Sequence, residues 1–128
     1  MRAVRSCDTG PELLVRQLLR RLGFTGYRLH CKKYPGKPDI AFIGRKKAIF
    51  VHGCFWHGHD CPRGRRAPKT NAEYWRRKTC RNKQRDSENN SALQRMNWEA
   101  LVVWECELKD KAALSERIKR FLAPESNL

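Results

Sequence analysis

The side chains best suited to chemistry are concentrated in residues 52–61, which read His-Gly-Cys-Phe-Trp-His-Gly-His-Asp-Cys. This stretch holds three of the 4 histidines and two of the 6 cysteines of the chain. Cysteine and histidine suit zinc, and Cys54, His59 and Cys61 could take three corners of a tetrahedron. Their spacing is not that of a standard zinc finger, so a fourth ligand must come from elsewhere in the chain.

The fourth zinc ligand has two candidates. Cys106, in a strand-like run, is the better one, because His57 would be lost to catalysis if it bound zinc. Four protein ligands make a closed site, and closed zinc sites are structural. The competing interpretation is that these residues are simply buried, since free cysteine packs as a small hydrophobe. It is less favoured because His, Gly and Asp interrupt any apolar pattern here.

The charge of the chain indicates a polyanionic partner. Lys and Arg total 28 against 13 Asp and Glu, for a net charge of +15 in 128 residues, which points to nucleic acid. The length favours one domain, residues 1–128. No apolar run reaches transmembrane length, and the N-terminus has no apolar core of a signal peptide. We therefore expect a cytoplasmic protein whose cysteines bind metal before they form disulfides.

The pattern of apolar residues predicts a mixed α/β fold, with a small sheet flanked by helices. The expected order is helix, three strands, helix, strand, helix. The expected ranges are a helix from about 9 to 23, strands over 27–31, 40–43 and 47–52, one or two helices over 71–97, a strand over 99–106 and a helix over 111–122. Glu12, three residues after Thr9, is interpreted first as a capping-box residue and second as a functional carboxylate.

A second group of candidates is expected at the open end of the hairpin formed by the second and third strands. Asp39 begins one strand and His52 ends the other, so a carboxylate and an imidazole should meet beside the zinc stretch. Asp39 alone would be taken as turn-stabilising, but His52, His57 and Glu12 are candidates for the same cleft. This set suits phosphodiester hydrolysis, which needs oxygen ligands for Mg²⁺ and a histidine that moves a proton. Asp86 of the long helix could orient that histidine.

Five segments in order resemble one family of DNA repair enzymes. They are residues 35–39, 49–61, 82–86, 93–98 and 103–106, and the His-Gly-Cys-Phe-Trp-His core is the most specific of them. The chain resembles the very-short-patch-repair (Vsr) DNA mismatch endonucleases over nearly its whole length. The resemblance implies a zinc-bearing, restriction-endonuclease-like fold. It also implies a Mg²⁺-dependent enzyme that nicks DNA 5′ to the thymine of a T·G mismatch, the product of 5-methylcytosine deamination.

The resemblance also implies a role for each matching residue. The implied catalytic residues are Asp39, His52, His57, Asp86 and Glu12, with His57 activating water and Asp86 as its partner. Mg²⁺ would be held by Asp39 and the main-chain carbonyl of Val51, where the best known members have threonine. The implied zinc ligands are Cys54, His59, Cys61 and Cys106.

Contacts with DNA are expected from two sets of side chains. The resemblance implies that Phe55 and Trp56 wedge into the base stack, and a mismatched step costs less to open than a matched one. Basic side chains would hold phosphates without reading sequence, and these are Lys32, Lys33, Lys37, Arg63, Arg65 and Arg66. The expected partners are mismatched double-stranded DNA and other mismatch repair factors, bound by a monomer in the bacterial cytoplasm, on the nucleoid when DNA is bound.

The start of the chain departs from the family pattern, and two competing hypotheses stay open. Residues 1–5 align with an internal stretch of longer members, so either the start of the chain is mis-assigned or a preceding basic segment is missing, which would reduce DNA affinity. One competing hypothesis is a zinc-stabilised DNA-binding module without catalysis. Another is a related restriction-type nuclease with a different target.

Overall fold

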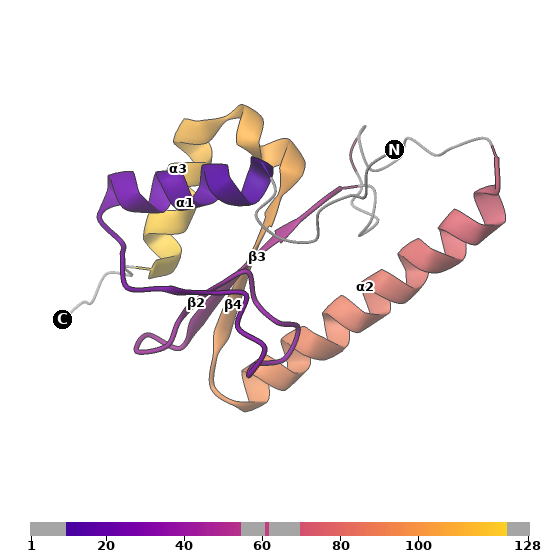
Figure 1. Ribbon diagram of the computed structural model, residues 1–128, viewed down its shortest axis with the longest axis horizontal. Coiled ribbons are helices and arrows are strands. Elements are labelled where there is room, and N and C mark those ends of the chain that lie inside the picture. Colours follow the sequence, from indigo (N-terminus) through magenta and orange to yellow (C-terminus); the bar gives the residue numbers. More distant parts are fainter. Residues whose placement is uncertain (1–9, 55–60, 62–69, 123–128) are drawn as a thin grey trace.

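The computed structural model describes residues 10–54, 61 and 70–122 (Figure 1). Three helices and four strands follow the predicted order, which confirms the mixed α/β class. The helices are α1 (Gly10–Leu22), α2 (Ala72–Arg95) and α3 (Lys111–Leu122), and the strands are β1 (Arg28–Leu29), β2 (Ile40–Phe42), β3 (Lys47–His52) and β4 (Glu99–Trp104). The 71–97 pattern is therefore one helix. The extent of the domain, residues 1–128, stays a prediction, because several segments lie outside the described residues.

The sheet has the strand order β1-β2-β3-β4. The β1–β2 and β2–β3 pairs are antiparallel, and β3 pairs with β4 in parallel from Lys47↔Glu99 to His52↔Trp104. Two parallel neighbours need a long crossover connection, and the chain between β3 and β4 includes α2. The parallel pair brings the ends of β3 and β4 side by side, so residues that follow these two strands become neighbours.

One face of the sheet carries the larger hydrophobic core. Alternate side chains of the strands pack there against α1 and α3, which lie together on this side of the sheet (Figure 1). Every buried member of this core is apolar: Val15, Leu18, Leu19, Ile40, Phe42, Ile49, Leu101, Val103, Leu114, Ile118 and Leu122. This face fixes where α1, and with it Glu12, lies against the strands.

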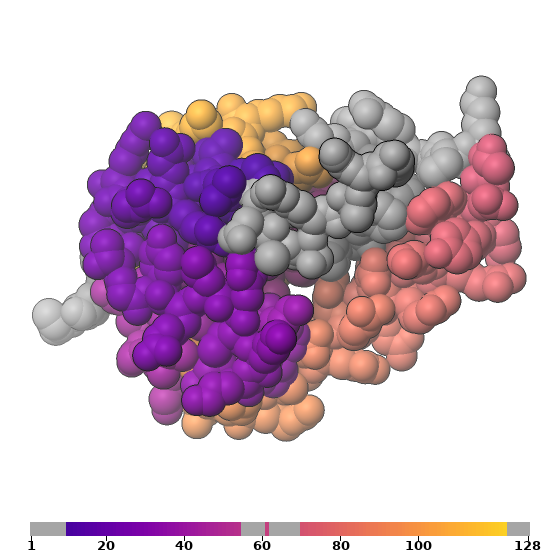
Figure 2. Space-filling view, in the orientation of Figure 1, coloured from indigo at the N-terminus to yellow at the C-terminus, as the bar shows by residue number. Residues whose placement is uncertain are grey.

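The opposite face has a smaller core, formed by Ala41, Ala48, Leu93 and Trp98. Leu93 is the one fully buried residue of α2, so the helix is attached to the sheet mainly through its C-terminal part. The first turns of α2 extend to the far right of the molecule (Figures 1 and 2). The half-buried stripe along the rest of α2 runs through Trp75, Lys78, Asn82 and Asp86, and it is mostly polar.

Three predicted strands are too long, and the one predicted over 40–43 ends one residue earlier, at Phe42. The strand predicted over 99–106 ends at Trp104, and Cys106 lies in a short 3-10 helix, η1 (Glu105–Lys109). The Glu107 carboxylate accepts the backbone N–H of Trp104 at 2.8 Å and so turns the chain. The strand predicted over 27–31 is reduced to two residues, because His30 adopts a left-handed conformation with φ 47°.

No helix in the described ranges is both long enough and apolar enough to cross a membrane.

Candidate active site

Three side chains from three different segments meet beside the open end of the β2–β3 hairpin. Glu12 comes from the first turn of α1, His30 follows β1, and Asp39 precedes β2. Their carboxylate oxygens and imidazole nitrogen all lie within 4.8 Å of one another, and the three residues form one of two groups that could hold a metal ion among the described residues. We call them the carboxylate cluster.

Asp39 is held by the backbone of β3. The N–H of Val51 donates to its Oδ2 at 2.7 Å, which confirms that the ends of the hairpin meet. Burial raises the pKa of Asp39 from 3.8 to about 6; the N–H of Val51 opposes this rise, and the nearby Glu12 carboxylate adds to it. A cation placed between the two carboxylates would remove this electrostatic cost.

Glu12 is 4% exposed, which is unusual for a glutamate. Its Oε1 lies 3.0 Å from His30 Nε2 and 3.5 Å from Arg16 Nη2. The capping partner Thr9 lies outside the described residues. The position of the carboxylate supports the second interpretation of Glu12, as a functional group.

His30 was not among the site residues predicted from the sequence. The signal that could have found it was the order of the predicted strands: had the strands over 27–31 and 40–43 been paired with each other, His30 and Asp39 would have come close together. The observed register pairs Leu29 with Ile40, and the next pair along this ladder is His30 and Asp39. An antiparallel ladder places side chains of opposite residues next to each other.

His52 ends β3 in a largely buried position, 8% exposed. Its ring makes an edge-on contact with the Trp104 ring at a centroid distance of 5.2 Å. Its Nδ1 lies 3.9 Å from Asp86 Oδ2 on α2. The resemblance implied Asp86 as the partner of His57, which lies outside the described residues, so that pairing stays a prediction.

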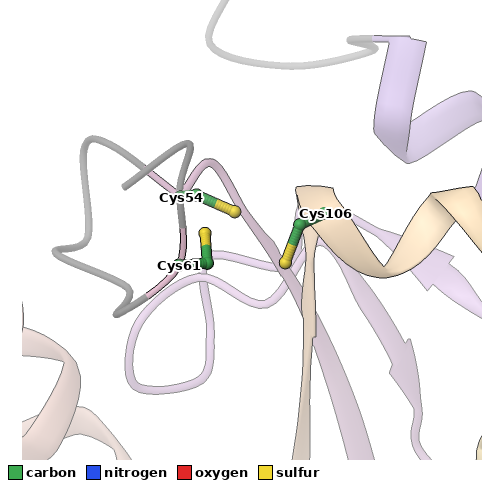
Figure 3. A group of neighbouring side chains, drawn as sticks. All are labelled: Cys54, Cys61 and Cys106. Carbon is green, nitrogen blue, oxygen red and sulfur yellow. The ribbon is translucent and has the colours of Figure 1, made fainter. Parts of the chain in front are cut away.

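A second group of metal-competent side chains lies just beyond the ends of β3 and β4. The sulfur atoms of Cys54, Cys61 and Cys106 lie within 4.8 Å of one another and are turned into one space (Figure 3). Cys54 and Cys61 are buried. Burial raises the pKa of Cys54 to about 12 and also raises the pKa of Cys106. We call these residues the cysteine cluster; its thiols suit a soft or borderline metal.

This chain is similar to one known protein family and to several of its members. A model of the family described as DNA mismatch endonuclease Vsr matches residues 1–63. The type II nicking enzyme V.XorIIP of Xanthomonas oryzae is 47% identical, over 97% of this chain and 90% of that protein. The DNA mismatch endonuclease Vsr of Escherichia coli is 36% identical, over 98% of this chain and 82% of its own length.

The chain belongs to the Vsr family. The type II nicking enzyme V.NmeAIP of Neisseria meningitidis is a further relative, 44% identical over 95% of this chain and 86% of its own. Membership makes the chain a Vsr-type DNA endonuclease, and it confirms the family that the five sequence segments indicate.

Some residues for which the sequence predicts a role lie outside the described residues. They are Phe55, Trp56, His57, His59, Arg63, Arg65 and Arg66. Their roles stay predictions. The three lysines expected on DNA phosphates, Lys32, Lys33 and Lys37, are exposed on the loop between β1 and β2.

Proposed function

We propose that this Vsr-family endonuclease nicks DNA 5′ to the thymine of a T·G mismatch by Mg²⁺-dependent hydrolysis of the phosphodiester bond. The observation that carries the proposal is the carboxylate cluster, which two strands and a helix assemble in a chain related to mismatch endonucleases and nicking enzymes. Two buried or half-buried carboxylates are the hard oxygen ligands that Mg²⁺ prefers. A fold of the restriction-endonuclease type belongs to the same proposal.

The metal ligands we propose are Asp39, Glu12 and the main-chain carbonyl of Val51. In an antiparallel ladder the N–H and C=O of one residue face the same neighbouring strand. Because the N–H of Val51 points to Asp39, its carbonyl faces the same side, so valine serves as well as threonine. When bound, Mg²⁺ would stabilise negative charge on the phosphate and favour ionisation of the attacking water.

We propose His57 as the base that takes a proton from the attacking water, and His52 as the second active-site histidine. The Nδ1 of His52 lies near Asp86, and a carboxylate next to an imidazole can fix its orientation. Asp86 lies on the polar stripe of α2, from which its carboxylate faces His52. Its predicted pairing with His57 belongs to this proposal.

We propose that the cysteine cluster binds a structural zinc ion, with His59 as its fourth ligand. Three thiols supplied by two separate segments would be tied together by one ion, and zinc with four protein ligands has no open position for chemistry. Burial disfavours bare thiolates here, so a bound cation is what would let these thiols ionise.

The proposed DNA contacts follow from charge and shape. Lys32, Lys33 and Lys37 lie exposed on the loop that leads into Asp39, so phosphates held by this loop would be close to the proposed metal. Arg63, Arg65 and Arg66 would add backbone contacts, and Phe55 with Trp56 would open the mismatched step. A monomer that meets other repair factors on DNA completes the proposal.

A nicking assay tests this proposal. End-labelled duplexes that carry T·G, T·A or C·G at one position are incubated with Mg²⁺ and the zinc-loaded protein, in several flanking sequences. Nicking of the thymine strand only in the T·G duplex is the expected result. Cleavage of matched duplexes would favour a restriction-type nuclease, and zinc-dependent binding without cleavage would favour a non-catalytic module.

A further inference from the structure

We propose that His30 is a positioning residue, which holds the Glu12 carboxylate against Asp39 by donating from Nε2 to Oε1. This inference rests on the proposed function, since it concerns the cluster to which we assign the metal. The observation behind it is the 3.0 Å contact between these two atoms, which joins residues 18 positions apart. His30 would act through Glu12 and not on the phosphate itself.

The backbone fixes His30 opposite Asp39. The N–H of His30 donates to the Asp39 carbonyl at 3.1 Å, and the N–H of Cys31 donates to the Pro38 carbonyl at 3.1 Å. These bonds carry the β1–β2 ladder past its last regular pair. His30 then adopts φ 47°, a left-handed conformation that few residues other than glycine take. Such conformations persist where the surrounding structure holds them, often at functional sites.

Glu12 reaches this place from a different layer of the fold. It is carried by α1, which packs on the sheet through apolar contacts that hold the helix but do not orient one carboxylate. Arg16 also contacts Glu12, but it lies one turn later on the same helix and at a longer distance, 3.5 Å. The contact with His30 is different in kind, because it ties the Glu12 carboxylate to the segment after β1, whose backbone is hydrogen-bonded to Asp39.

The proposal gives His30 the role that hydrogen-bonded partners of ligating carboxylates have in metal sites. Their loss commonly lowers metal affinity or activity by about 10- to 100-fold. A donor at the position of Nε2 is what the role requires. The amide nitrogen of glutamine reaches about as far as Nε2, whereas asparagine is one methylene shorter and tolerates the left-handed backbone. His30→Gln thus keeps a donor near the position of Nε2, whereas His30→Asn suits the backbone conformation but does not reach Glu12. The two variants together separate the effect of the donor from that of the backbone.

The test is Mn²⁺ binding, followed by electron paramagnetic resonance on the zinc-loaded full chain without DNA. His30→Asn should weaken Mn²⁺ binding by about 10-fold or more, while His30→Gln stays within about threefold of wild type. Nicking rates should follow the same order. Leu29→Ala, in an exposed position one residue earlier, is the matched control and should bind Mn²⁺ as wild type does.

Unchanged Mn²⁺ affinity in His30→Asn would overturn the positioning role. An equal loss of Mn²⁺ affinity in both His30 variants would also overturn it. If Co²⁺ bound in place of Mn²⁺ then gave a different absorption spectrum in His30→Gln, His30 would be a direct metal ligand. Asp39→Ala separates this inference from the proposed function. If Asp39→Ala abolishes Mn²⁺ binding but His30→Asn does not weaken it, only the inference fails. If wild type and Asp39→Ala bind Mn²⁺ equally, or neither binds it, the proposed metal site fails and the role of His30 fails with it.

Discussion

The carboxylate cluster and the cysteine cluster lie at the same end of the sheet, but they differ in chemistry and exposure. Cys54 is fully buried and its neighbours offer sulfur, whereas the carboxylate cluster offers oxygen and keeps the His30 side chain 24% exposed. Sulfur ligands in a closed site suit structural zinc, and carboxylate oxygens beside a partly exposed histidine suit Mg²⁺. On this difference we base the proposal that the cysteine cluster holds the fold and the carboxylate cluster carries the chemistry.

Strand β3 links the two clusters, so that the carboxylate cluster depends on the cysteine cluster and not the reverse. The N–H of Val51 holds Asp39, His52 ends the strand, and Cys54 follows two residues later. Fixing Cys54 against Cys106 therefore fixes the end of the strand that positions Asp39. Loss of the cysteine cluster should disturb the carboxylate cluster, while loss of the carboxylates should leave the cysteines intact.

The largest expected effect comes from Cys106→Ser. Because structural zinc contributes its binding free energy to folding, this change should remove zinc and lower the unfolding free energy by several kcal/mol, on the order of that contribution. Zinc content by atomic absorption and thermal unfolding measure both effects. Cys80→Ser, at an exposed position on α2, is the control and should change neither. Full zinc content in Cys106→Ser would mean that Cys106 is not a ligand.

Asp39→Ala should show the opposite pattern. Nicking should fall by about a thousandfold, since removing a ligand of a catalytic metal forfeits several kcal/mol of transition-state stabilisation. Zinc content should stay at the wild-type level, and mismatch binding should be largely kept. Rate assays, zinc analysis and a gel-shift titration test the three parts separately. Full activity in this variant would remove the case for a metal at Asp39.

Asp39→Asn tests the cost of burying the carboxylate in protein free of Mg²⁺. The pKa of Asp39 is about 6 in the folded protein against an ordinary 3.8, so the folded state binds this proton more tightly. Wild type should therefore lose stability as pH rises from about 4 to about 6, and the loss is complete above that window. A shift of about two units corresponds to about 3 kcal/mol.

Asparagine does not titrate and can still accept the Val51 N–H. Asp39→Asn should therefore gain stability relative to wild type between pH 4 and pH 7. Urea unfolding of both proteins at the two pH values measures this gain, and their shared cysteine cluster cancels in the difference. If the difference in unfolding free energy between the two proteins stays constant with pH, burial does not raise the pKa of Asp39.

Local signals in the sequence were enough for part of the site. The turn between two apolar runs predicted the hairpin, and with it the meeting of Asp39 with the end of β3. Ligand chemistry pointed to Cys106 even though the strand before it was drawn too long. The sequence did not predict the left-handed backbone of His30 or the place where α2 docks, because both depend on distant contacts. The sequence therefore placed Asp86 on the long helix, but it did not predict that His52 would be its neighbour.

The smallest expected effect concerns the loop that leads into Asp39. If Lys33 contacts a phosphate, Lys33→Ala should weaken DNA binding about equally for matched and mismatched duplexes and reduce the slope of log affinity against log salt by about 1. Lys119→Ala is the matched control, since Lys119 is equally a surface lysine but lies on α3. Fluorescence anisotropy at several salt concentrations gives both slopes. If both variants lower the slope alike, the phosphates are held by the overall +15 charge of the chain. If only Lys33→Ala does so, the loop guides the backbone toward the carboxylate cluster.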